Sequence, residues 1–295
     1  MKKKFVKKGI FLAILAAALY AINAPFSKML LEYIPSTMMA GLLYIGAGIG
    51  MGAVSLFRKN GGTEDRRFTK KEFPYVAAMI LLDVAAPISL LFGLSMTAAA
   101  NASLLNNFEI VATALIAFFA FREKISGRLW LGIIFVTLSC AVLSFEDVSA
   151  FRFSAGSFFV LLAAVFWGIE NNCTRALSEK DPLIIVLLKG IFSGGTSFVI
   201  ALFLGERAEN LWSIFAVLAV GFVAYGMSIF VYVYAQRMLG AARTSAYYAA
   251  APFIGAAISL FVFREVPGTQ FLGALVLMIF GAWLSSSDEP LLKKE

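Results

Sequence analysis

The stretch Tyr20–Pro35, YAINAPFSKMLLEYIP, has a weak counterpart 147 residues later in Trp167–Pro182, WGIENNCTRALSEKDP. The positions that agree are Tyr20 with Trp167, Ile22 with Ile169, Ser27-Lys28 with Thr174-Arg175, Glu32 with Glu179, and Pro35 with Pro182. A second series, at an offset of 142, aligns Met96 with Met238, Ala99-Ala100 with Ala241-Ala242, Ser103 with Ser245, and Phe121-Arg122-Glu123 with Phe263-Arg264-Glu265. This ordered self-similarity predicts two repeats, residues 1–150 and 151–295.

The composition places both repeats in a membrane. Of 295 residues, 60% are hydrophobic and 15% are charged, whereas ordinary globular domains have about 25% charged residues. Apolar blocks of about 20 residues recur along the whole chain, and each is long enough to cross a bilayer as a helix. The ten predicted spans are Gly9–Leu31, Ser36–Phe57, Phe73–Ser95, Ala99–Phe121, Arg128–Phe145, Ser154–Leu177, Pro182–Leu204, Leu211–Met238, Thr244–Phe263 and Thr269–Ser286.

The basic residues predict how these spans are oriented. One set of alternate loops carries twenty Lys and Arg residues, and the other set carries only Arg152, Arg207 and Arg264. Cytoplasmic loops are enriched in Lys and Arg, so both termini and the loops Arg58–Lys71 and Arg122–Arg128 are expected in the cytoplasm of a multi-pass plasma-membrane protein. Five helices per repeat is an odd number, so the second repeat runs opposite to the first. The expected fold is an all-α integral membrane protein of ten transmembrane helices in two inverted five-helix repeats.

Several functional classes are excluded or disfavoured by the sequence. The chain has no histidine and no Gly-x-x-x-x-Gly-Lys-Ser/Thr loop, so no metal site, no cofactor and no nucleotide-driven pump is expected. The basic residues lie at the ends of apolar blocks, which disfavours nucleic-acid binding. The N-terminus also resembles a cleavable signal peptide, but its repetition in mid-chain argues against removal. Expected partners are a small-molecule cargo and the lipid bilayer, with the protein a monomer or weak homodimer.

Inverted repeats are typical of transporters, because two related halves can open a midplane site alternately to either side. Within the predicted spans lie five charged residues, Lys28, Asp83, Glu109, Glu170 and Lys189. Charge in hydrocarbon costs at least about 2.5 to 3.5 kcal/mol, so each needs a physical reason. We expect Lys28 to reach the interface, and Glu170 and Lys189 to form a structural ion pair with Glu170 also open to cargo contact.

Asp83 and Glu109 are expected near the midplane without a basic partner. They are therefore candidates for holding the positive group of the cargo or a coupling proton. The alternative is that both are protonated carboxyls that only brace neighbouring helices. The full set of candidate cargo-binding residues, chosen by repeat position and helix face, is Tyr20, Asn23, Asp83, Asn106, Glu109, Trp167, Glu170, Asn171, Tyr225 and Tyr248. Carboxyls beside aromatic rings favour an amine-bearing metabolite over a simple anion.

The two halves, each with an Ala-rich start to its fourth helix and Phe-Arg-Glu at that helix's end, resemble the EamA family of the drug/metabolite transporter superfamily. The resemblance covers essentially residues 9–286. It implies a ten-helix exporter-type fold, a central cavity lined mainly by helices 1, 3, 4, 6, 8 and 9, and small-metabolite cargo such as amino acids. One departure concerns a mid-helix proline that the family often has in helices 4 and 9: this chain has Pro252 but Ile110.

The interpretation that the sequence favours is a secondary-active exporter, coupled to protons or running down the cargo gradient. Three alternatives stay open: an exporter of lipophilic organic cations, a membrane-embedded lipid enzyme with Asp83 and Glu109 as acid and base, and a sensor that transports nothing. The glycine series in the second helix predicts close packing, either inside the protein or between protomers. Its members are Gly41, Gly46, Gly48, Gly50 and Gly52.

Overall fold

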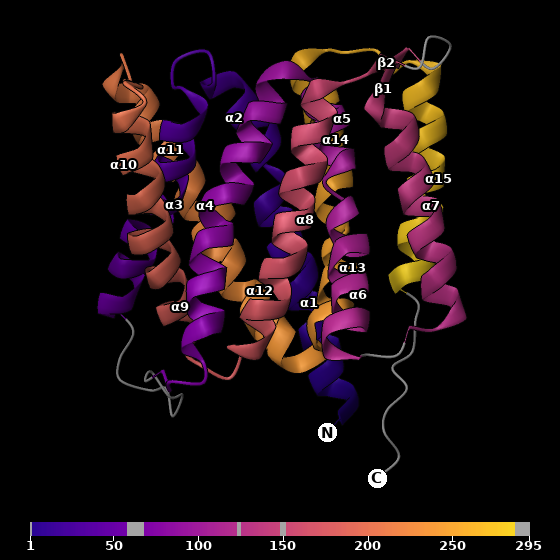
Figure 1. The fold of residues 1–295 in the computed structure, drawn as a ribbon, viewed down its shortest axis with the longest axis horizontal. Helices are drawn as coiled ribbons and strands as arrows, with labels where there is room; N and C mark the ends of the chain where they lie inside the picture. Colours follow the sequence, from indigo (N-terminus) through magenta and orange to yellow (C-terminus); the bar gives the residue numbers. More distant parts are fainter. Residues whose placement is uncertain (1, 58–67, 123–124, 148–151, 287–295) are drawn as a thin grey trace.

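The computed structural model describes residues 2–57, 68–122, 125–147 and 152–286, and they are almost entirely helical (Figure 1). Within these residues, nine helical stretches are long and apolar enough to cross a membrane, and Thr269–Ser285 is a shorter apolar helix. The nine stretches are Val6–Leu30, Ser36–Phe57, Phe73–Met96, Ala99–Ala120, Gly127–Ser144, Ala155–Ala176, Pro182–Phe203, Leu211–Leu239 and Arg243–Phe263. The predicted all-α fold of ten spans is confirmed.

The first half of the chain contains seven helical elements, because two of its five spans are interrupted. They are α1 (Lys2–Ala21), α2 (Asn23–Leu30), α3 (Ser36–Phe57), α4 (Phe73–Met96), α5 (Ala99–Leu105), α6 (Phe108–Phe121) and α7 (Gly127–Ser144). A short antiparallel hairpin follows, which the sequence did not predict. Its strands β1 (Phe145–Asp147) and β2 (Arg152–Phe153) pair Phe145 with Phe153. The predicted repeat boundary falls within residues 148–151, outside the described residues.

The second half has the same order of spans and two π-helical turns. Its elements are α8 (Ala155–Ala176), α9 (Pro182–Leu188), η1 (Lys189–Gly194), α10 (Gly195–Phe203), α11 (Leu211–Val220), η2 (Gly221–Met227), α12 (Ser228–Leu239), α13 (Ala241–Tyr248), α14 (Ala250–Phe263) and α15 (Thr269–Ser286). We call the face of the bundle that carries β1 and β2 the hairpin side, and the opposite face, where α1 begins and α15 ends, the terminal side (Figure 1).

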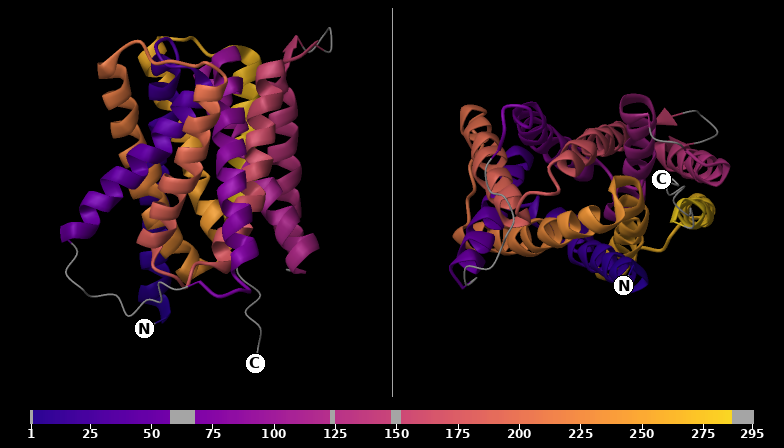
Figure 2. Two further views of the ribbon diagram at one scale, coloured as in Figure 1. Left: turned by 60° about the vertical axis from the view of Figure 1, so that its left-hand side comes forward. Right: turned by 90° about the horizontal axis from the view of Figure 1, so that it is seen from below.

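The two halves exchange equivalent contacts. In the first half α4 packs on α8 of the second half, and in return α12 packs on α1. Helices α7 and α15 pair with each other at one edge of the bundle, while α3 packs on η1, α10, α11 and η2 at the other edge (Figures 1 and 2). The spans that enclose the centre are therefore those containing α1, α4, α6, α8, α12 and α13.

The glycines of α3 allow close helix contact inside the chain. A Cβ on Gly190 of η1 would lie 2.5 Å from the Cα of Gly48, so no side chain fits between the two backbones. A Cβ on Gly41 would likewise lie 2.7 Å from the backbone nitrogen of Phe198. Of the two packing alternatives for these glycines, the structure shows contacts within the protein.

Three spans break at turn residues between two α-helices, and in two of them a proline follows within the next helix. Pro25 has no N–H for the carbonyl of Ala21, and Pro252 has none for the carbonyl of Tyr248, which explains the breaks between α1 and α2 and between α13 and α14. The first-half fourth span was expected as one helix, Ala99–Phe121, with Ile110 in place of proline. It nevertheless breaks between α5 and α6, where the Glu109 N–H donates to the Asn106 carbonyl three residues back at 3.1 Å.

The repeated Phe-Arg-Glu motif marks the end of a helix in each half. Arg122 has φ 54° and ends α6, and Arg264 has φ 53° and ends α14. Both arginines adopt the left-handed conformation that helix ends commonly use, although glycine is the usual residue there. Glu123, residues 58–67 of the predicted cytoplasmic loop, and the lysines at 293 and 294 lie outside the described residues.

Candidate cargo-binding site

A central cavity with an empty volume of about 510 Å³ lies between the two halves. Its lining residues are Tyr20, Tyr44, Asp83, Glu109, Trp167, Glu170, Asn171, Thr174, Lys189, Tyr225, Ser228, Ile229, Tyr232 and Tyr248. Eight of the ten predicted cargo-binding residues are in this set. The other two, Asn23 and Asn106, line a second pocket.

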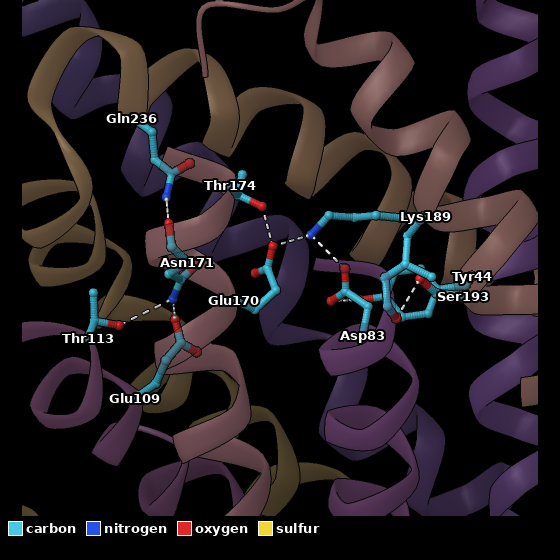
Figure 3. Close-up of polar contacts among 11 residues, drawn as sticks. Tyr44, Asp83, Glu109, Thr113, Glu170, Asn171, Thr174, Lys189, Ser193 and Gln236 are labelled. Atoms are coloured by element: carbon cyan, nitrogen blue, oxygen red, sulfur yellow. Dashed lines mark hydrogen bonds and ion pairs between the residues drawn. The ribbon is translucent and has the colours of Figure 1, made fainter. Parts of the chain in front are cut away.

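A buried network of three charges forms one wall of the cavity (Figure 3). The Nζ of Lys189, on η1, lies 2.8 Å from Oε1 of Glu170 on α8 and 2.9 Å from Oδ2 of Asp83 on α4. The expected pair of Glu170 and Lys189 is present. The expectation that Asp83 lacks a basic partner was wrong, because η1 packs on α4, and the ammonium of Lys189 reaches Asp83 as well as Glu170.

Hydroxyl groups complete this network. Tyr44 of α3 donates a hydrogen bond to Oδ1 of Asp83 at 2.5 Å, and Thr174 donates to Glu170 from the next turn of α8. Each carboxylate therefore has one ammonium and one hydroxyl partner, as buried charges require. Tyr44 was not among the predicted site residues. Its signal in the sequence is a single phenol in the middle of a mostly apolar and glycine-rich helix.

Glu109 is a third carboxylate in the cavity, and it has a different kind of partner. Its Oε1 accepts a hydrogen bond from the Asn171 side chain at 2.6 Å, and the Asn171 amide also lies 3.4 Å from the Thr113 hydroxyl (Figure 3). Gln236 of α12 donates to the Asn171 carbonyl at 3.3 Å, which fixes this part of α8. Within the described part of the chain no lysine or arginine contacts Glu109, as the sequence predicted.

Aromatic rings line the rest of the cavity. Tyr20 is central: its ring centroid lies 6.2 Å from that of Trp167, 5.8 Å from that of Tyr225 and 5.7 Å from that of Tyr248. Tyr44 packs edge-on against Tyr225 at 5.0 Å. The repeat partners Tyr20 and Trp167 thus meet in the middle of the molecule, where residues on the axis relating two halves are expected.

A second pocket lies on the hairpin side of Tyr20, with an empty volume of about 290 Å³. Asn23 and Asn106 line it, and Tyr20 lines both pockets. Asn23 accepts a hydrogen bond from Ser27 at 3.0 Å, and its amide lies 3.5 Å from the hydroxyl of Tyr225. These two predicted residues therefore belong to a neighbouring site.

Lys28 lies away from both pockets. Its Nζ donates to the carbonyls of Leu94 at 2.6 Å and Thr97 at 2.9 Å, where α4 ends on the hairpin side. Lys28 therefore lies near a helix end, as expected. In addition, its ammonium is held by backbone carbonyls of the neighbouring span.

Sequence comparison assigns the chain to a family. The profile of the EamA-like transporter family matches residues 7–145 and again residues 154–287. The chain belongs to the EamA-like transporter family. As an EamA-like protein it is a multi-pass membrane transporter and not an enzyme, and the resemblance seen in the sequence is confirmed.

Relatives of this EamA-like chain are also named as transporters, without a substrate. An "Uncharacterized transporter" of Methanothermobacter thermautotrophicus is 28% identical over 273 residues, covering 87% of this chain and 80% of the relative. An "Uncharacterized transporter" of Clostridium kluyveri is 24% identical over 297 residues, covering 96% and 94%. A solved structure titled "Crystal structure of protein" shares the fold at a TM-score of 0.72 and 16% identity, covering 94% of this chain and 95% of that one.

Proposed function

We propose that this transporter exports a small amine-bearing metabolite, an amino acid or a related compound, from the cytoplasm across the plasma membrane by alternating access. The observation that carries the proposal is the charge of the central cavity. Asp83, Glu109 and Glu170 face a single ammonium, that of Lys189. With all four groups ionised, two negative charges are unbalanced in a buried site.

An unbalanced buried charge is costly, so the site favours whatever supplies positive charge. The ammonium of a cargo molecule is one source and protons are the other. Glu109 is the better candidate for contact with the cargo, because its hydrogen-bond partner Asn171 is neutral. A carboxylate that binds a proton when the site is empty, and releases it when an amine binds, would move protons and cargo in opposite directions across the membrane. Asp83 and Glu109 are therefore the candidates for proton coupling.

The aromatic lining supports an organic cation over a bare metal ion. Cations are attracted to the faces of Tyr and Trp by about 0.5 to 2 kcal/mol each, depending on desolvation. Six of the lining residues are aromatic, namely Tyr20, Tyr44, Trp167, Tyr225, Tyr232 and Tyr248. The same observation favours a second candidate cargo, lipophilic organic cations. Lys189 does not distinguish the two cargo classes, because its ammonium already pairs with Asp83 and Glu170.

The orientation follows from the charges of the loops. With the terminal side in the cytoplasm, export would carry cargo from the terminal side, through the central cavity, to the hairpin side. The chain needs no nucleotide in this scheme. The cargo gradient or the proton gradient provides the driving force.

The test uses purified protein in liposomes, with radiolabelled amino acids and the corresponding primary amines offered as cargo. Saturable flux of an amine that responds to an imposed pH gradient is expected. Glu109→Gln and Asp83→Asn should each reduce this flux at least about 10-fold, since a lost charge-assisted hydrogen bond is worth about 1.5 to 3 kcal/mol. Glu179→Gln is the matched control, because Glu179 is exposed and outside the cavity.

Two outcomes would contradict the proposal. If only anions or neutral solutes cross, the cavity does not serve amines. If amines cross with unchanged affinity and pH dependence in both variants, the carboxylates are structural and the amine is held elsewhere.

A further inference from the structure

The pocket on the hairpin side of Tyr20 differs chemically from the central cavity. Its lining includes Asn23, Ser103 and Asn106 among apolar residues such as Leu90 and Pro252, and it contains no charged residue. It therefore has no means of holding an ion by charge pairing, and it has neutral polar groups on an apolar wall.

Two of these polar groups have no hydrogen-bond partner. The hydroxyl of Ser103 and the side-chain carbonyl oxygen of Asn106 are both buried and unpaired, and the two residues are only 5% and 6% exposed. Buried polar groups in folded proteins are nearly always paired, and an exception needs an explanation. A ligand that supplies the missing hydrogen bonds is such an explanation.

The backbone around the pocket is also interrupted. The breaks between α1 and α2, between α5 and α6, and between α13 and α14 contribute Ala21, Asn106 and Ala251 to its wall. Interrupted helices at membrane depth are tolerated where they are buried in protein or line a cavity, and transporters build binding sites from them. The three breaks thus meet where the unpaired groups lie.

The two pockets are adjacent. Asn106 in the second pocket and Glu109 in the central cavity are three residues apart across the break between α5 and α6, and the backbone N–H of Glu109 donates to the carbonyl of Asn106. Tyr20 lines both pockets. One small molecule with two polar groups separated by an apolar body can therefore reach both.

We propose that the pocket holding Ser103 and Asn106 is a specificity subsite that binds an uncharged hydrogen-bond donor, a hydroxyl or N–H group, at the far end of the cargo. The inference rests on the proposed function, in which the central cavity holds the ammonium of the same molecule. Asn106 accepts the hydrogen bond of the donor, and Ser103 pairs with it as donor or acceptor. The preferred substrate class is an amine whose side chain ends in such a group.

Two amines that differ by one hydroxyl test the subsite. Tyramine has a phenol where phenethylamine has hydrogen, and both have the same ammonium. We expect wild-type protein to bind tyramine at least about 10-fold more tightly in calorimetry, since sites that bond a hydroxyl discriminate strongly against its absence. Ser103→Ala and Asn106→Leu should bring the ratio near one, while Glu109→Gln should weaken both amines and keep the ratio.

Ser259→Ala is the control for lost packing. Ser259 is a fully buried serine of α14 whose hydroxyl already bonds the Gly255 carbonyl of its own helix at 2.7 Å, and it lines neither pocket. This variant should keep the wild-type ratio. If Ser103→Ala unfolds the protein, Asn106→Leu provides the same measurement. A wild-type ratio near one, or a ratio unchanged by both variants, overturns the proposal.

A neutral pair of probes separates this proposal from the amine proposal. Phenol and anisole differ in whether the oxygen carries a donor, and neither has an ammonium. If wild-type protein binds neither amine but binds phenol more tightly than anisole, and Ser103→Ala abolishes that preference, the subsite stands and the amine-export proposal fails. If amines bind but no pair is discriminated, the subsite fails and amine export stands.

Discussion

The first half and the second half of the chain put equivalent residues around the centre but give them different chemistry. At equivalent positions, Ser27 donates to Asn23 and Thr174 donates to Glu170, each from the next turn of its helix. This hydrogen bond is therefore present in both halves, whereas the side chain that accepts it is charged only in the second half, at Glu170. Asp83 likewise has the neutral Tyr225 as its repeat partner. The scaffold is symmetric, and the electrostatics of the cavity is not.

The ends of the same spans differ too. Lys28 bonds carbonyls at the end of α4 on the hairpin side. Its repeat partner Arg175 is exposed and lies near the end of α12 on the terminal side, with its Nε 3.9 Å from the Cβ position of Gly240. Within the described residues its guanidinium donates no hydrogen bond, while its backbone carbonyl is bonded by Ser178. Equivalent cations are thus engaged at one end and free at the other. Under the proposed alternating access, the two ends of the molecule would be held with different strength.

The largest expected effect is the loss of the charge that only the second half supplies. Lys189→Met leaves two buried carboxylates without a cation, which should lower the free energy of unfolding by about 3 to 5 kcal/mol. Lys189 contacts both Asp83 and Glu170, so adding Glu170→Gln to Lys189→Met should restore stability only in part. The triple variant Lys189→Met, Asp83→Asn and Glu170→Gln should restore most of it. Denaturant titration in mixed micelles measures this.

Complete rescue by Glu170→Gln alone would contradict the bridging role of Lys189. It would show that the carboxylate of Asp83 is stable without the ammonium, and the cavity would then contain one ion pair.

A smaller effect is expected where glycines of the same span differ in packing. A Cβ on Gly190 would lie 2.5 Å from the Gly48 backbone, whereas Gly195, the repeat partner of Gly48, has no atom within 4 Å of its Cβ position. Gly190→Ala should therefore cost about 1 to 3 kcal/mol by overpacking, and Gly195→Ala should stabilise its helix by up to about 1 kcal/mol. Thermal unfolding midpoints compare the two, and equal shifts would speak against the close contact of α3 with η1.

Replacing Lys28 and replacing Arg175 should have unequal effects on access to the second pocket, because only the side chain of Lys28 is hydrogen-bonded within the described part of the chain. Lys28→Met removes the bonds to α4, each worth about 0.5 to 1.5 kcal/mol or more with a charged donor, and should expose the second pocket. A cysteine at Ala24, which lines that pocket, should then react roughly 10-fold faster with a maleimide, whereas Arg175→Met should change its rate little. The measurement uses protein with Cys140 and Cys173 replaced by alanine. Equal rates in all three proteins would mean that Lys28 does not hold the hairpin side.

The smallest effect should be the same in both halves. Arg122 and Arg264 adopt positive φ, which costs a residue with a side chain about 1 to 2 kcal/mol and glycine almost nothing. Glycine loses more entropy on folding, by about 0.5 to 1 kcal/mol, so Arg122→Gly and Arg264→Gly should each raise stability by roughly 0.5 kcal/mol. A gain in one half and a loss in the other would show that the arginine side chains act differently.

Sequence reasoning reached the fold because span length, loop charge and the internal repeat each report on the membrane independently. It also found most of the cavity, since repeat position indicates which residues lie near the axis. It missed the contact of Lys189 with Asp83 and the role of Tyr44, because both depend on how α3, α4 and η1 pack, which spacing along one helix does not encode. The break at Asn106 was missed because no proline signals it.

The pairing of α7 with α15 resembles a contact between two copies of one chain. Gly132 and Gly281 approach each other's backbones, and Ser139 bonds the Ala274 carbonyl, so the early part of each helix meets the late part of the other. A homodimer with two-fold symmetry makes contacts of this self-complementary kind. Here the two partners belong to one chain, so they need not be identical. Each repeat can therefore carry charges that the other does not have.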